Sequence, residues 1–121
     1  MARDALLTLT PTAFEILLTL ADGERHGYGI LVEVEERTGG RVRLRPGSLY
    51  RALHRLLEQD LVEGAEAAPG DRREGEGEDE RRRYYRITAG GLAAVRNEAE
   101  RMARSVRAAR AKALIPGEEA P

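Results

Sequence analysis

Residues 41–61, RVRLRPGSLYRALHRLLEQDL, decide the fold of this chain. Pro46-Gly47 is a turn signal, and Ser48 is placed to cap a helix that runs to about Gln59. At about 100° per residue, one face of that helix carries only apolar side chains, namely Leu49, Ala52, Leu53, Leu56 and Leu57. The pattern predicts a helix that packs this face against a hydrophobic core.

The opposite face of the same helix is rich in hydrogen-bond donors. It carries Arg51 and Glu58, flanked by His54 and Arg55, with Tyr50 near the boundary, and it follows three further arginines, Arg41, Arg43 and Arg45. Long donors opposite an apolar face are typical of a helix that enters the DNA major groove. They are equally typical of an ordinary amphipathic surface helix, so the neighbouring segments must distinguish the two readings.

Composition excludes several classes of protein. The 121 residues suit one domain with an appendage, and the absence of cysteine excludes disulfides and Cys-ligated zinc. With two histidines and no catalytic signature motif, we expect no enzyme activity, no catalytic residues, no metal and no cofactor. No apolar run approaches the roughly 20 residues that span a bilayer, which predicts a cytoplasmic protein without membrane contact.

Charge is unevenly distributed along a chain whose net charge is −1. Residues 61–80 hold eight acidic and two basic side chains, whereas residues 81–121 hold four acidic and ten basic ones. The mean charge therefore says little about local electrostatic fields.

Two helices are expected before the stretch that decides the fold. Thr10-Pro11 reads as an N-cap followed by proline at the first helical position, and that helix ends near Asp22-Gly23. The segment His26-Gly27-Tyr28-Gly29 opens the second helix, which ends at Thr38. Glycines flanking Tyr28 are unfavourable in a helix, which predicts either close approach of a neighbouring helix or a frayed start.

Two strands and a loop are expected after the stretch. The strands cover about 62–67 and 82–87, and the acidic, Gly-rich loop at 68–80 is predicted to be flexible. Strands that bracket a loop directly after a helix-turn-helix make a wing. Residues 1–88 therefore predict a winged helix-turn-helix domain, mainly α with a small two-stranded β wing (α+β).

A long helix is predicted at 89–113, with Thr88 as its cap, followed by a disordered tail at 114–121. Its apolar residues recur in steps of three and four and form a stripe of Leu92, Val95, Ala99, Met102, Val106, Ala109 and Ala113. A stripe on a projecting helix needs a partner surface, and the simplest is a second copy of the chain. We therefore expect a C-terminal dimerisation helix.

Taken in order, these motifs closely resemble the PadR family of bacterial transcriptional regulators. The most specific are His26-Gly27-Tyr28, the run Pro46-Gly47-Ser48-Leu49-Tyr50, and Arg83-Tyr84-Tyr85 with Ile87-Thr88. The resemblance implies a winged helix-turn-helix repressor that is dimeric through its C-terminal helix and whose DNA affinity drops when an effector binds. The chain departs from the family in its acidic wing loop and in lacking the tryptophan with which some members stack flat ligands.

The expected function is that of a homodimeric, sequence-specific transcriptional repressor on a pseudo-palindromic double-stranded operator. The candidate DNA contacts are Arg41, Arg43, Arg45, Ser48, Tyr50, Arg51, His54, Arg55, Arg81, Arg82 and Arg83. One alternative is a sensor for a small aromatic effector, with a pocket lined by Tyr28, Tyr50, Tyr85 and Met102, although these side chains suit a core better. The other is a protein-interaction adaptor that uses the scaffold without reading an operator.

Overall fold

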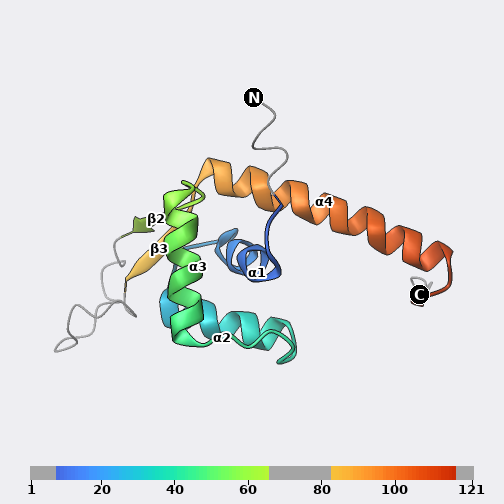
Figure 1. Cartoon of the computed structure of the whole chain (residues 1–121), viewed down its shortest axis with the longest axis horizontal. Coiled ribbons are helices and arrows are strands. Elements are labelled where there is room, and N and C mark those ends of the chain that lie inside the picture. Colours follow the sequence, from blue (N-terminus) through green and yellow to red (C-terminus); the bar gives the residue numbers. More distant parts are fainter. Residues whose placement is uncertain (1–7, 66–82, 117–121) are drawn as a thin grey trace.

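The computed structural model describes residues 8–65 and 83–116. In chain order, these residues form α1 (Pro11–Leu20), β1 (Arg25–His26), α2 (Gly27–Arg37), α3 (Pro46–Glu58), β2 (Val62–Ala65), β3 (Tyr84–Ile87) and α4 (Ala89–Ala111). Helices α1 to α3 gather around a core, the strands lie at one side of it, and α4 runs outward (Figure 1). The predicted wing loop at 68–80, Arg81, Arg82 and most of the predicted tail at 114–121 lie outside the described residues.

The N-cap predicted for α1 is confirmed, whereas the N-cap predicted for α3 is wrong. Thr10 caps α1 as predicted, because its hydroxyl accepts from the Ala13 N–H at 3.0 Å and Pro11 takes the first helical position. Helix α3 begins three residues earlier than predicted, with Arg45 as its N-cap and Pro46 inside the first turn. The assignment of Ser48 as N-cap was therefore wrong. A proline ring presets the helical φ and its missing N–H costs nothing at the first helical position, so Pro46 begins the helix rather than ending the turn before it.

The sheet is antiparallel, with the strand order β1-β3-β2. Strands β2 and β3 form the predicted wing pair, in which Val62 lies opposite Ile87. A third strand was not predicted: Arg25 and His26 pair with Tyr85 and Tyr84 of β3. His26 is therefore the N-cap of α2 and not its first residue, and the wing joins a three-stranded sheet.

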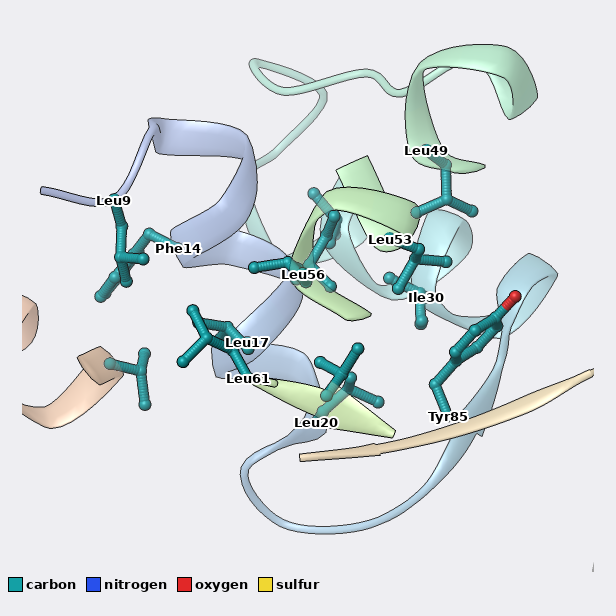
Figure 2. Packing of buried hydrophobic residues seen from close by; sticks show 14 of the residues in the cluster. Leu9, Phe14, Leu17, Leu20, Ile30, Leu49, Leu53, Leu56, Leu61 and Tyr85 are labelled. Carbon is teal, nitrogen blue, oxygen red and sulfur yellow. The ribbon is translucent and has the colours of Figure 1, made fainter. Parts of the chain in front are cut away.

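The leucine face of α3 packs into the core as predicted. Leu49, Leu53 and Leu56 are at most 1% exposed, and they meet buried side chains of α1 and α2 while Tyr85 closes the core from β3 (Figure 2). Each buried leucine contributes about 1.5–3 kcal/mol relative to an exposed one. This packing fixes which face of α3 remains at the surface.

Helix α4 has two parts with different surroundings. Near its start Val95 is buried in the core and Leu92 is half-buried, and the helix lies along α1. Its distal part then leaves the rest of the molecule, with Met102 and Val106 exposed (Figure 1). Across residues 8–65 and 83–116, no helix combines the length and the apolar character needed to cross a membrane.

Candidate nucleic-acid interface

The exposed face of α3 forms a shallow groove of about 380 Å³, lined by Gly47, Tyr50, Arg51, His54, Arg55 and Glu58. Arg51, His54 and Arg55 are exposed and lie opposite the buried leucines of the same helix. The helical period that directs the leucines inward therefore brings these three side chains together at the surface. Gly47 was predicted only as a turn residue, but its spacing of four from Arg51 places both residues on one helix face.

Contacts within the groove are exposed. The Arg51 Nη2 donates to the Ser48 Oγ at 3.4 Å, and the His54 Nε2 lies 3.4 Å from the Glu58 Oε2. Exposed pairs of this kind are worth at most about 1 kcal/mol, so these side chains are free to exchange them for contacts with a ligand. Glu58 also places a carboxylate beside the guanidinium groups, and a carboxylate can accept from the cytosine amino group.

The segment before α3 presents its arginines outward. Arg41, Arg43 and Arg45 are exposed, whereas Val42 is half-buried and Leu44 is buried. The two apolar side chains of the segment thus face the core, while the three guanidinium groups remain at the surface. The Arg43 Nε lies 3.7 Å from the Glu35 Oε2 of α2, and both side chains of this ion pair are largely exposed.

Tyr50 is directed toward α2 and not outward. Its hydroxyl is fully buried, and a Cβ added to Gly27 would meet the ring carbons Cε1 and Cζ at 3.0 Å and the hydroxyl still closer. This placement corrects the expectation that the Tyr50 hydroxyl faces DNA. The close approach predicted from the two glycines was that of a helix backbone, and this was wrong: the Tyr50 side chain of α3 lies against Gly27, and only the His26 side chain lies near Gly29.

The wing contains one exposed and one paired arginine among the described residues. Arg83 is exposed directly before β3. Arg86 donates through Nε to Glu63 of β2 at 2.9 Å and through Nη1 to Glu24 at 3.1 Å. The hydrogen bond to Glu63, followed by that to Glu24, raises the pKa of Arg86. Arg86 therefore links the wing to the turn before β1.

The residues predicted to line an effector pocket lie in different parts of the molecule. Tyr28 is 61% exposed on α2, Tyr85 is 3% exposed in the core, and Met102 is 36% exposed on the distal part of α4. Tyr50 faces Gly27. In this arrangement the four side chains do not meet around a common cavity.

The predicted dimerisation stripe divides in the same way as α4. Val95 belongs to the core of its own chain, which corrects its assignment to a surface between subunits. Leu92 is half-buried near it, while Ala99, Met102 and Val106 are exposed and Ala109 is half-buried. The stripe that remains for a partner therefore begins after Val95.

The chain matches known proteins in both sequence and fold. The model of the transcriptional regulator PadR-like family matches residues 16–97. An uncharacterised 37.1 kDa protein in transposon TN4556 of Streptomyces fradiae is 39% identical over 89 residues, which cover 74% of this chain and 22% of that protein. The chain thus spans about a fifth of the length of this curated relative.

Two solved structures share the fold. A PadR family transcription regulator from Clostridium difficile superposes with a TM-score of 0.67 at 21% identity, covering 84% of this chain and 96% of that one. Bacillus subtilis PadR in complex with operator DNA superposes with a TM-score of 0.57 at 18% identity, covering 94% of this chain and 52% of that one. The family model covers most of this chain, and the fold agrees with it: the chain belongs to the PadR-like family of transcriptional regulators.

Proposed function

We propose that this protein is a transcriptional repressor that binds a pseudo-palindromic operator as a homodimer, with α3 of each copy in the major groove. The observation that carries the proposal is the division of α3 into a buried leucine face and an exposed face with Arg51, His54 and Arg55. The Bacillus subtilis relative, which shares the fold, is a protein bound to operator DNA.

Two kinds of contact are expected at each half-site. Arg51 and Arg55 are long enough to pair bidentately with guanine O6 and N7 and so to read sequence. Arg41, Arg43, Arg45 and Arg83 are exposed and are proposed to contact phosphates, which set the position of the protein without reading bases. Ser48, in the first turn of α3, would add a hydroxyl contact to a phosphate.

A second copy of the chain supplies the other half-site. The exposed residues Met102 and Val106 continue along α4 toward Leu114 and Ile115, which are also exposed, so an apolar surface remains uncovered in the single chain. Pairing of α4 with its symmetry mate would bury this surface. Two reading helices related by a two-fold axis fit half-sites about 34 Å apart, or one turn of DNA.

The proposal is tested by substituting the two arginines of the groove. A duplex enriched from a random library by the wild-type protein serves as the probe, and dissociation constants are measured by fluorescence anisotropy. Arg51→Ala and Arg55→Ala should each weaken binding about five- to hundredfold, the loss expected for one bidentate pair. Arg104→Ala, on the side of α4 away from its apolar stripe, is the matched control and should bind as the wild type does.

Two results would contradict the proposal. If the wild type enriches no duplex, the chain does not bind DNA specifically. If it does, but both groove variants bind with unchanged affinity, α3 is not the reading element.

A further inference from the structure

The turn that follows α3 is joined to the start of α4 through Thr88. Its hydroxyl donates to the Asp60 carbonyl at 2.7 Å and accepts from the Gly91 N–H at 3.0 Å. Its own N–H donates to the Leu61 carbonyl at 3.1 Å. One threonine therefore caps α4 and ties it to the turn that leaves α3.

The backbone around this contact is closely packed. Gly91 is buried in the first turn of α4, where an added Cβ would overlap the Leu61 carbonyl oxygen and lie 2.6 Å from the Ile87 Cγ1. Asp60 has a φ of 61°, in the left-handed region, and the Leu61 N–H donates to the Leu56 carbonyl at 2.9 Å. The contact therefore combines the Thr88 hydroxyl with backbone groups of both segments, and the close packing at Gly91 leaves little room for the angle between the two helices to change.

We infer that Thr88 and Gly91 form a joint that fixes the angle between the reading helix α3 and the dimerisation helix α4. The joint thereby sets the half-site spacing that the homodimer accepts. The inference rests on the proposed function, and it assigns to Thr88 and Gly91 a positioning role for DNA recognition beyond their role in capping a helix.

The length of α3 explains why this angle matters. Its 13 residues make a rod about 20 Å long, at roughly 1.5 Å per residue. With α4 held in the dimer, a rotation of about 10° at the joint moves the far end of α3 by roughly 3.4 Å, the rise of one base pair. A loosened joint should therefore widen the range of distances between the two reading helices by about one base pair.

The first test measures that spacing directly in the protein without DNA. The chain contains no cysteine, so Arg45→Cys at the exposed start of α3, the end far from the joint, accepts one spin label per copy. Pulsed electron-electron double resonance then gives the distance between the two spin labels of the homodimer. Thr88→Val keeps the side-chain shape but removes the two hydrogen bonds of the hydroxyl. The distribution of distances between the two labels should therefore broaden or shift by about 3 Å or more. Thr88→Ser keeps the hydroxyl and should retain the wild-type distances.

The second test measures spacing preference on DNA. The half-site enriched by the wild type is placed in duplexes whose two copies are separated by the native spacing, or by one or two base pairs more or less. The wild type and Thr88→Ser should prefer one spacing. For each protein, the affinity for the best spacing is divided by the affinity for the second-best spacing. In Thr88→Val this ratio should be at least about threefold smaller than in the wild type, because the variant discriminates less between spacings. A residue that only stabilised the fold would change the unfolding temperature and leave this ratio unchanged.

A second variant keeps the inference testable if Thr88→Val does not fold. Asp60→Gly keeps the carbonyl that accepts from Thr88 but removes the Cβ that restricts the backbone at this left-handed position, so it should fold and also broaden the label distances. Unchanged label distances and an unchanged spacing ratio in the folded variants would overturn the inference about Thr88 and Gly91 but not the proposed function. A wild type that is monomeric would overturn the proposed function, and the joint with it.

Discussion

At the scale of single residues, the contact between Gly27 and Tyr50 joins two of the most specific motifs of the sequence. A methyl group at residue 27 would meet the Tyr50 ring at 3.0 Å and the buried hydroxyl closer still. We therefore expect Gly27→Ala to destabilise the protein by about 1–3 kcal/mol, as overpacking of a core does. Urea unfolding monitored by circular dichroism measures the change.

The identity of the clashing atom can be tested in the same experiment. Tyr50→Phe removes the hydroxyl, so it should recover part of the loss in the Gly27→Ala background. Gly90→Ala is the matched control, because an added Cβ there meets no atom closer than 3.7 Å, and it should leave stability unchanged or slightly raised. An equal effect of Gly27→Ala and Gly90→Ala would show that the close packing is unimportant.

Gly27 and Tyr50 also show which contacts could not be predicted from the sequence. Gly27 was predicted to lie against a neighbour because a glycine inside a helix is costly, yet the neighbour could not be named, since Tyr50 approaches only through tertiary packing. Tyr50 itself sits at the boundary between the two faces of α3. At such a position the helical period does not decide between the core and the surface, and the hydroxyl turned inward.

At the scale of elements, α4 contains a carboxylate that folding holds in its charged form. Glu98 is buried, and its Oε2 accepts from the Arg101 Nη2 one turn later. The hydrogen bond from Arg101 lowers the pKa of Glu98 below its ordinary value of 4.5, although burial acts in the opposite direction. A lowered pKa means that the charged carboxylate stabilises the folded state.

Because the pKa of Glu98 is lower in the folded state, the free energy of unfolding depends on pH. The contribution of Glu98 is fully present above its ordinary pKa and is lost as the pH falls through the lowered value. The free energy of unfolding of the wild type should thus exceed that of Glu98→Gln at neutral pH, and the difference should shrink as the pH falls below 4.5. A gap between wild type and Glu98→Gln that is constant across this range would rule out the effect.

Elements with a long apolar period were predicted well from the sequence, and short ones were not. Helices α1 to α4 follow from repeating apolar positions, with caps predicted correctly at Thr10 and Thr88 but not at Ser48. The pairing of β2 with β3 follows from two short β-forming runs that flank a loop. Strand β1 has only two residues, too few for any period, and it exists because β3 offers it a pairing edge. Val95 fits the stripe of α4 by spacing, but spacing cannot tell whether a residue packs on its own chain or on a partner.

At the scale of the whole molecule, α4 has an apolar surface that residues 8–65 and 83–116 of the same chain do not cover. Met102 is 36% and Val106 39% exposed, beyond the point where the helix parts from the core. A carboxylate placed in a dimer interface at these positions would lose its hydration without a partner. The double variant Met102→Glu/Val106→Glu should therefore be monomeric by analytical ultracentrifugation while the wild type is dimeric.

Loss of the dimer should weaken operator binding far more than loss of one contact. Two linked reading helices gain about 10²- to 10⁴-fold in affinity over one, because the second binds as an intramolecular event. The monomeric variant should lose most of this factor on the enriched duplex while its binding to a single half-site stays unchanged. Ala108→Glu adds the same carboxylate to an exposed position away from the stripe, so it should remain dimeric and bind as the wild type does. A double variant that stays dimeric would place the interface elsewhere, and the rotation of α4 about its joint would then no longer set the distance between the reading helices.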